Sequence, residues 1–256
     1  MIQLESVRKS FGGVVAANDV SLKFPTGSLS AIIGPNGAGK TTLFNLITGH
    51  LVPDEGRISV DGQTISGLHP HAIAKEGVGR TFQIASVFPS LTVKEALIAA
   101  ASCYQGTSEN LFQPFPPAKA AKRAEELLDL LDLTSVGYRL TSEVSHGDQK
   151  LLDIGLALAL DPKVLLLDEP TAGMGPEERW QMIRTVQRLW QNGGMTLIFI
   201  EHDMDIVFEI AETIHVLRYG QVIASGDAAE IKSNTEVIEA YLGADHGEAI
   251  PVEVSA

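Results

Sequence analysis

A glycine-rich stretch of the sequence, "GPNGAGKTT" (34–42), combines residue types that bind phosphate. Glycines let the backbone turn several N–H groups toward an anion, and a helix that begins there adds its positive end. Lys40 is expected to reach the β- and γ-phosphates of a nucleotide, and the Thr41 hydroxyl to bind Mg²⁺. The alternative is a glycine-rich turn without a ligand, which a strand before it and a helix after it disfavour. The residues assigned to nucleotide contact are Gly34, Pro35, Asn36, Gly37, Ala38, Gly39, Lys40, Thr41 and Thr42.

Two adjacent carboxylates follow an apolar run in "VLLLDEP" (164–170). If that run is a buried strand, Asp168 and Glu169 lie at its carboxyl end, where α/β sheets bind ligands. Asp168 is expected to hold Mg²⁺ through water, and Glu169 to polarise an attacking water molecule. The alternative is an acidic turn that caps the next helix. A phosphate loop in the same chain favours the hydrolytic interpretation.

Two further polar residues stand at positions that a hydrolytic site would use. His202 in "IFIEHD" (198–203) ends another apolar run, so it is expected beside the carboxylates and in contact with a γ-phosphate. The alternative is that His202 is an ordinary polar residue at the end of a strand, with no functional role. Gln83 in "RTFQ" (80–83) lies at a junction between two parts of the chain and has no distinctive chemistry by itself.

The elements around these motifs alternate between strands and helices. "SLSAIIG" (28–34) reads as a strand, and the residues after the phosphate loop have helical apolar spacing up to Gly49. Residues 2–8 and 20–24 alternate in polarity and, with 57–62, predict antiparallel strands.

The second half of the chain contains uninterrupted apolar strands and a helical segment. Residues 163–167 and 196–200 predict strands of a parallel sheet covered on both faces. Between them, Pro176 and Gly193–Gly194 are helix start and stop signals. A linker over 103–117 precedes a helix whose apolar face comprises residues 120, 124, 127, 128 and 131. We expect one domain over 1–245, with a helical subdomain at about 84–160 inserted in an α/β core, and a disordered tail at 246–256.

Composition narrows the class of protein. A chain of 256 residues is long enough for one large domain, and its net charge of −13 argues against a nucleic-acid partner. Cys103 is the only cysteine, so no internal disulfide forms and a reducing compartment is expected. The N-terminus has no signal-peptide pattern, which predicts a cytoplasmic location.

These motifs, in this order and over nearly the whole chain, resemble the ATP-binding subunit of an ABC transporter. The resemblance implies an α/β fold: a P-loop NTPase core, with a mostly parallel sheet flanked by helices, an antiparallel β subdomain and an inserted α-helical subdomain. It implies that Phe11 stacks on adenine and that Gln83 contacts nucleotide and Mg²⁺. The groove near Gln83 and residues 84–100 is expected to receive a helix of the permease.

The resemblance also assigns a role to "VSHGDQ" (144–149), which occupies the place of the family's signature sequence. Ser145, Gly147 and Gln149 are kept, and His146 stands where the family usually has its first glycine. In the family's head-to-tail dimer, Ser145 and the Gly147 N–H would meet the γ-phosphate bound by the other protomer, at a helix that begins near Asp148. His146 is either a plain substitute for glycine, which is favoured, or a residue that tunes closure.

One position departs from the family pattern. In "TAGMG" (171–175), Gly175 replaces the aspartate that is usual in the family. The signal between sites that this aspartate carries in the family is therefore in doubt here.

Finer features are similar to the ATPases of branched-chain (hydrophobic) amino acid importers, namely "VGRTFQ", "VFPSLTVKEAL", "DEPTAGM" and "EAYLG". The "SHG" stretch is similar to urea and short-amide importers. The implied partners are permease subunits at the inner face of the membrane, a second ATPase protomer and, indirectly, a periplasmic binding protein. A heterodimer with a related ATPase is favoured over a homodimer. The alternatives are a lipopolysaccharide-type exporter ATPase and a soluble ABC ATPase of DNA repair or translation.

Overall fold

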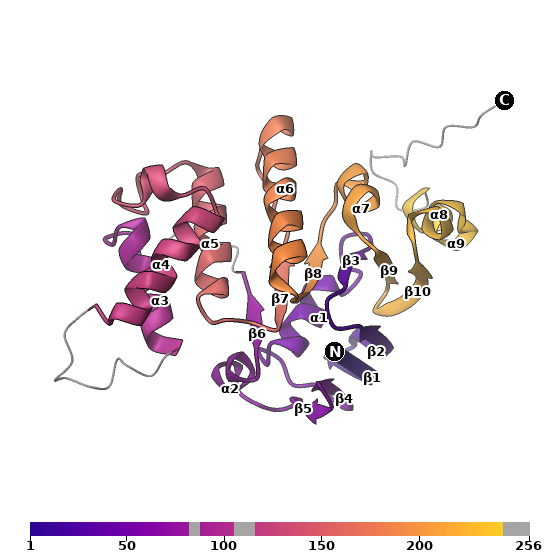
Figure 1. The fold of residues 1–256 in the computed structure, drawn as a ribbon. Helices are drawn as coiled ribbons and strands as arrows, with labels where there is room; N and C mark the ends of the chain where they lie inside the picture. The colour runs from indigo at the N-terminus through magenta and orange to yellow at the C-terminus, as the bar shows by residue number, and fades with distance from the viewer. Residues whose placement is uncertain (82–87, 105–115, 243–256) are drawn as a thin grey trace. The chain divides into compact units, whose positions relative to one another are not determined.

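The structure is a computed structural model that describes residues 1–81, 88–104 and 116–242 (Figure 1). The chain divides into two compact units: unit 1 comprises residues 1–70 and those from 196 onward, and unit 2 comprises 71–195. In the described ranges, no helix is both long and apolar enough to cross a membrane. Gln83 and the predicted tail lie outside the described residues.

Four antiparallel strands form one sheet of unit 1, in the order β2-β1-β4-β5. The strands are β1 (Ile2–Phe11), β2 (Val14–Phe24), β4 (Glu55–Val60) and β5 (Gln63–Thr64). The predicted antiparallel strands are confirmed, but β1 and β2 are longer than 2–8 and 20–24. They continue to a two-residue hairpin turn in which Phe11 pairs with Val14. Gly12 in this turn has a φ of 58°, which glycine adopts without strain.

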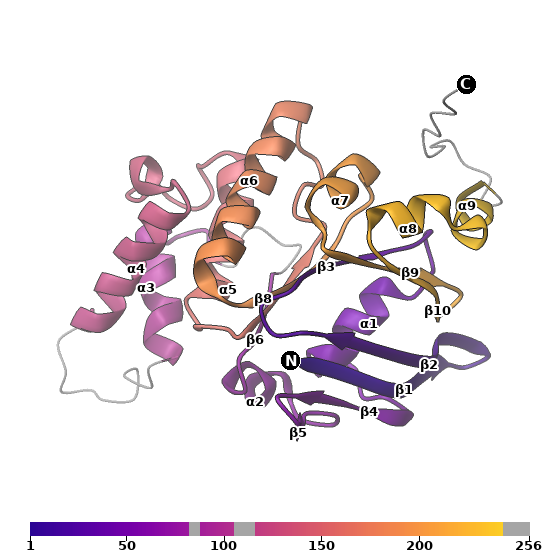
Figure 2. The same cartoon turned by 45° about the vertical axis from the view of Figure 1, so that its right-hand side comes forward.

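A second sheet of unit 1 is centred on β3 (Leu29–Ile33). Its neighbours are the parallel strands β8 (Thr196–Ile200) and β9 (Thr213–Arg218), and β10 (Gln221–Gly226) pairs antiparallel with β9. Every residue of β3 and β8 is buried, as predicted for strands covered on both faces. The predicted helix α1 (Lys40–Ile47) follows the glycine-rich stretch and lies between the two sheets (Figures 1 and 2).

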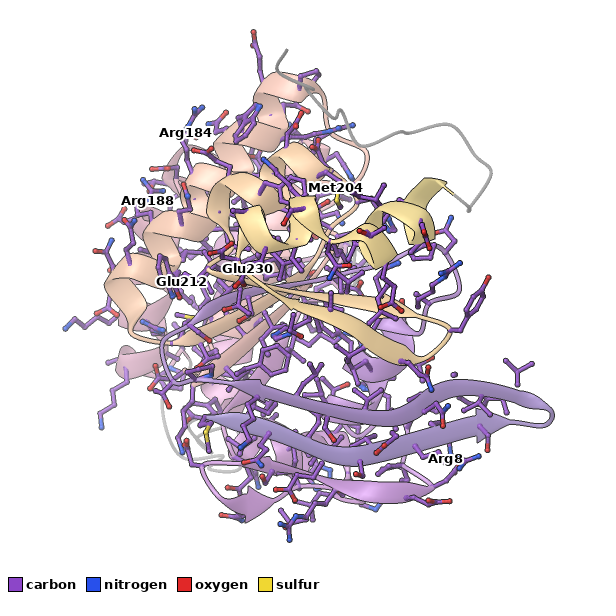
Figure 3. The ribbon with its side chains drawn as sticks, turned by 90° about the vertical axis from the view of Figure 1, so that its right-hand side faces the viewer. Arg8, Arg184, Arg188, Met204, Glu212 and Glu230 are labelled. Carbon is purple, nitrogen blue, oxygen red and sulfur yellow. The ribbon has the colours of Figure 1, made fainter. Side chains whose placement is uncertain are left out.

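Three short helices complete unit 1: α7 (Met204–Ile210), α8 (Ala228–Ser233) and α9 (Thr235–Leu242). Glu212 lies between α7 and β9, and its carboxylate accepts a hydrogen bond from the Leu29 N–H at 3.1 Å (Figure 3). Helix α8 begins with a capping box in which Asp227 and Glu230 bind each other's backbone N–H groups. Carboxylates therefore fix the start of α8 and the backbone at Leu29.

Unit 2 contains two parallel strands and a group of helices. The strands are β6 (Val78–Arg80) and β7 (Val164–Asp168). The helices are α2 (Pro70–Lys75), α3 (Val93–Tyr104), α4 (Ala118–Leu130), the 3₁₀ turn η2 (Thr134–Val136), α5 (His146–Leu158) and α6 (Pro176–Gly193).

Helices α3, α4 and α5 pack side by side (Figure 1). The apolar face predicted for α4 is confirmed, because residues 120, 124, 127, 128 and 131 are all buried. Gly155 of α5 allows close packing, since a Cβ there would lie 2.8 Å from Leu131 Cδ1 and 2.9 Å from Leu97 Cδ2. The predicted linker over 103–117 begins too early: α3 continues through Tyr104, and no glycine or proline interrupts it before Gly106.

Helix α6 begins and ends at the predicted residues, Pro176 and Gly193, and Gly194 adopts a left-handed φ of 61°. Arg184 and Arg188 lie along one side of this helix in Figure 3. Within unit 2, Arg188 Nη2 donates to Leu130 O at 3.1 Å and to Asp132 Oδ2 at 2.7 Å. These bonds connect α6 to the last residue of α4 and to the turn that follows it.

The core of unit 1 contains a titratable group, His215 of β9, which is 5% exposed. Its Nδ1 lies 2.8 Å from Ser225 Oγ, and its Nε2 is buried without a hydrogen-bond partner among the described residues. The ring meets Phe24 edge-on at a centroid distance of 5.0 Å. Burial lowers the pKa of His215 from its ordinary value of 6.5 to about 4.

We predict that His215 makes unfolding easier in mild acid. Below pH 6.5 the unfolded chain takes up a proton on His215 that the folded chain excludes until about pH 4. The free energy of unfolding should therefore fall by about 1.4 kcal/mol for each pH unit in this window, or roughly 2 kcal/mol between pH 7.5 and 5. Urea denaturation at both pH values should show that His215→Gln loses this part of the pH dependence. The exposed control His71→Gln should keep it, and equal pH dependence in His215→Gln and the unaltered protein would contradict the prediction.

Candidate functional site

The glycine-rich stretch predicted to bind phosphate is a loop at the carboxyl end of β3, in unit 1. A Cβ atom on Gly34 would collide with the Leu217 carbonyl oxygen, and one on Gly39 with that of Ala16. The Gly220 N–H donates to Ala38 O at 2.9 Å, which ties the loop to the turn between β9 and β10. Packing against neighbouring backbone therefore fixes the loop at two glycines that have no room for a side chain.

Lys40 is buried inside this loop, with 7% of its surface exposed. Its Nζ donates to Gly34 O at 2.6 Å and to Pro35 O at 3.1 Å, so the ammonium group is held over the loop. Asn36, Gly37 and Thr41 are exposed. A backbone loop at a helix start, with a lysine held over it and an open face, fits a polyphosphate.

His202 follows β8, which pairs in parallel with β3 so that Ile200 is opposite Ile32. The carboxyl ends of the two strands therefore share one edge of the sheet, where both the phosphate loop and His202 lie. The His202 side chain is exposed, and its backbone N–H donates to Glu201 Oε2 at 3.2 Å. Unit 1 thus brings together two of the predicted features, the phosphate loop and this histidine.

Phe11 lies at the end of β1 and is 47% exposed. The alternative that it is a core phenylalanine is therefore wrong. The Lys9 ammonium lies 5.7 Å from the centroid of its ring. An exposed ring of this kind can stack on a base, which agrees with the predicted role of Phe11.

Tyr241 of α9 was not among the predicted site residues, although the loop's first glycine contacts it. Burial raises the pKa of Tyr241, and a hydrogen bond with the backbone of Gly34 offsets part of this shift. The C-terminal helix thus contacts the phosphate loop within unit 1. The sequence carried no signal for this contact apart from an aromatic residue in a short amphipathic helix.

In unit 2, Asp168 is the last residue of β7 and is 3% exposed. Its Oδ2 pairs with Arg80 Nη2 of the neighbouring strand β6 at 2.7 Å, and its N–H donates to Thr81 Oγ1 at 3.3 Å. Its Oδ1 is buried and has no hydrogen-bond partner among the described residues. Arg80 was missed by the sequence reasoning, although a buried aspartate at a strand end requires a cation nearby.

An unpartnered carboxylate oxygen fits the role of Asp168 as a magnesium ligand, because Mg²⁺ binds one or two carboxylates together with water and phosphate. The described residues contain no cluster of three or more histidine, cysteine, aspartate or glutamate side chains that would hold a metal alone. A metal bound at Asp168 would therefore need ligands of other kinds, such as a hydroxyl, an amide, water or the nucleotide.

Glu169 is the first residue after β7 and has a φ of 49°. This left-handed conformation is uncommon for a residue with a side chain, and residues held in it are enriched at functional sites. Its carbonyl oxygen accepts hydrogen bonds from the Ala172 N–H at 3.2 Å and from Lys150 Nζ at 3.3 Å. The turn, and not simple alternation along the strand, therefore sets the direction of the Glu169 side chain.

The predicted signature sequence lies at the start of α5 in unit 2. The helix begins at His146, two residues before Asp148, and Ser145 is its N-cap. Ser145 Oγ accepts a hydrogen bond from the Asp148 N–H at 3.1 Å and donates to Asp148 Oδ2 at 2.8 Å. A serine hydroxyl at an N-cap is a strong local reason for the helix to begin there.

The neighbours of the other predicted residues near the start of α5 differ from one residue to the next. Among the described residues, a Cβ on Gly147 would meet only Ser145 Oγ within 4 Å, at 3.8 Å. Gln149 Nε2 donates to Thr141 O at 3.2 Å, within the same chain. His146 Nε2 lies 3.3 Å from Ala172 O. Gly175, where the family usually has aspartate, is the N-cap of α6, and its N–H donates to Glu178 Oε2.

Comparison with known proteins agrees with this set of features. The family described as "ABC transporter" matches residues 17–172, and the family described as "Branched-chain amino acid ATP-binding cassette transporter" matches residues 221–247. A crystal structure of the ADP conformation of an ATP-binding cassette of an ABC transporter is similar, with a TM-score of 0.85 and 33% identity. The similarity covers 95% of this chain and 98% of that one.

Two curated relatives are similar over nearly the whole chain. The high-affinity branched-chain amino acid transport ATP-binding protein BraF of Pseudomonas aeruginosa is 36% identical over 95% of this chain and 98% of its own length. LivG of Escherichia coli K12, which has the same description, is 35% identical with the same coverage. The α/β fold expected for a P-loop NTPase is therefore confirmed. Because the first family match spans more than half of the sequence, this chain belongs to the family of ABC transporter ATP-binding proteins.

Proposed function

We propose that this chain is the ATP-binding and ATP-hydrolysing subunit of an importer for branched-chain or other hydrophobic amino acids. The ATPase assignment rests on two features that occur in one chain. One is the backbone loop that encloses Lys40, and the other is the turn that carries Asp168 and Glu169. For the solute, the support is the match of residues 221–247 to a branched-chain amino acid transporter family and the names of the two relatives.

Each residue has a role in the proposed hydrolysis, in which water attacks the γ-phosphorus and the bond to the β–γ bridging oxygen breaks. The backbone N–H groups of the phosphate loop and Lys40 bind the phosphate oxygens. Glu169 accepts a proton from the attacking water, and His202 donates a hydrogen bond to a γ-phosphate oxygen. Thr41, Asp168 and Gln83 would hold Mg²⁺, which supplies positive charge at the phosphates when bound.

In the proposed complex the chain acts as a dimer in which Ser145, Gly147 and Gln149 complete the nucleotide site of the other protomer. The space beside Gly147 supports this role, because among the described residues only Ser145 Oγ would lie within 4 Å of a Cβ there. We propose permease subunits as the membrane partner, with the ATPase pair peripheral on the cytoplasmic face. A related ATPase remains the favoured second protomer.

A urea or short-amide importer is the second candidate, and the observation that favours it is His146 in the "SHG" stretch. The ATPase does not touch the solute, so the two candidates differ in partners and not in the site. Stimulation of ATP turnover by a solute-loaded binding protein in the reconstituted transporter would distinguish leucine from urea.

We predict that Glu169→Gln binds ATP but hydrolyses it at least about 100-fold more slowly, because the amide cannot accept the proton from water. The variant should also accumulate as an ATP-bound dimer in size-exclusion chromatography. The control is Glu177→Gln, which changes an exposed glutamate in the first turn of α6 and should keep full turnover. Full turnover in Glu169→Gln would exclude Glu169 as the general base.

We predict that Lys40→Ala weakens ATP binding by about 10- to 100-fold, since it removes one charge-assisted hydrogen bond to phosphate. Equilibrium titration with a fluorescent ATP analogue measures this change. Lys23→Ala, on the exposed side of β2, is the matched control and should bind as the unaltered protein does. An unchanged affinity in Lys40→Ala would rule out the phosphate-loop assignment.

We predict that affinity-tagged chain, purified from native membranes in mild detergent, carries permease subunits and a second ATPase. Mass spectrometry of the purified complex identifies these partners. Recovery of ribosomal proteins or DNA in their place would instead support a soluble ABC ATPase of translation or DNA repair.

A further inference from the structure

Two side chains on one face of α5 reach the turn that follows the carboxylates. His146 and Lys150 are four residues apart, so they are neighbours on the helix surface. Lys150 Nζ donates to Glu169 O at 3.3 Å, and His146 Nε2 lies 3.3 Å from Ala172 O. Both contacts are made to backbone carbonyl groups, one at each end of the turn over 169–172.

These contacts have a defined chemistry. A carbonyl oxygen only accepts hydrogen bonds, so the contact with Ala172 requires a proton on His146 Nε2. The Lys150 ammonium group has donors only, which suits a carbonyl oxygen. It is 9% exposed and lines a small cavity together with Thr81, Asp153 and Asp168. The ammonium group is thus enclosed on the side of the helix that faces the carboxylates of its own unit.

The turn is a segment whose conformation requires support. Glu169 has a left-handed φ of 49°, and the Ala172 N–H closes the turn on the Glu169 carbonyl at 3.2 Å. Gly173 has a φ of 80°, and a Cβ there would lie 3.3 Å from His146 Nε2. The imidazole therefore covers the backbone at Gly173, which is a second observation that links His146 to this loop.

We propose that His146 and Lys150 are positioning residues that hold the 169–172 turn and thereby orient the Glu169 carboxylate. The inference deepens the proposed function and rests on its assignment of Glu169 as general base. Ser145 caps the same helix turn that carries His146. A displacement of the start of α5 by a nucleotide at Ser145 and Gly147 would therefore reach Glu169 through two hydrogen bonds. His146 is then more than a substitute for glycine, and it supplies a link at a loop where Gly175 replaces aspartate.

The test compares variants that remove each hydrogen-bond donor with variants that keep one. His146→Ala and Lys150→Met should each lower kcat by about 10-fold and leave the KM for ATP within about 2-fold, because they misplace the base without changing the phosphate loop. His146→Gln and Lys150→Arg retain a donor and should recover at least half of the activity. His71→Ala, an exposed histidine on α2, is the control and should have the kcat of the unaltered protein.

The double variant His146→Ala/Lys150→Met distinguishes one shared turn from two separate effects. If both residues hold the same turn, the double variant should lose about as much kcat as the more affected single variant. An unchanged kcat in His146→Ala would overturn the proposal. His146 is exposed, so this variant should fold. It therefore tests the proposal even if Lys150→Met does not fold. Loss of thermal stability with an equal kcat would also overturn it.

The experiments distinguish a failure of the positioning role from a failure of the proposed function. If Glu169→Gln keeps full turnover, Glu169 is not the base and the proposed function fails at that residue. If Glu169→Gln is inactive while His146→Ala and Lys150→Met keep the kcat of the unaltered protein, only the positioning role fails.

Discussion

The buried ion pair between Arg80 and Asp168 is the interaction on which the arrangement of unit 2 depends. Asp168 is almost completely buried at the end of β7, and a carboxylate in that position is strongly disfavoured without a cation. Arg80 provides it from the end of β6, and the parallel register that pairs Arg80 with Leu166 brings the two side chains together. The pair engages only one carboxylate oxygen. The second oxygen has no hydrogen-bond partner among the described residues, which is consistent with the proposed metal role of Asp168.

The phosphate loop of unit 1 depends on a different constraint, because it presents backbone N–H dipoles and not a carboxylate. Its constraint is space: Gly34 and Gly39 lie against the carbonyl groups of Leu217 and Ala16, so the loop can pack only if these residues lack a side chain. The chain has a net charge of −13, yet charges more than about 8 Å apart are largely screened at physiological salt. A polyanion at this loop therefore interacts mainly with nearby N–H groups and with Lys40.

The sequence predicts the elements whose signals are local, and it fails where contacts join distant segments. The strand at 196–200, the helix ends at Pro176 and Gly193 and the buried face of α4 follow directly from apolar periodicity and from glycine and proline. The left-handed turn at Glu169 carries no such signal, since glycine, asparagine and aspartate are the residues that usually mark one. The Arg80 pair and the Tyr241 contact depend on strand register and on the return of the C-terminal helix, which periodicity does not encode.

Glycines offer a way to tell internal packing from external recognition in this chain. At Gly34 and Gly39 the neighbouring backbone explains the missing side chain. At Gly147, the second residue of α5, the described residues give no such reason: its φ is not positive, and the nearest described atom to a Cβ would be Ser145 Oγ at 3.8 Å. In the proposed dimer, a close approach by a group from outside the chain would account for this glycine, and the helix start capped by Ser145 would be suited to an anion.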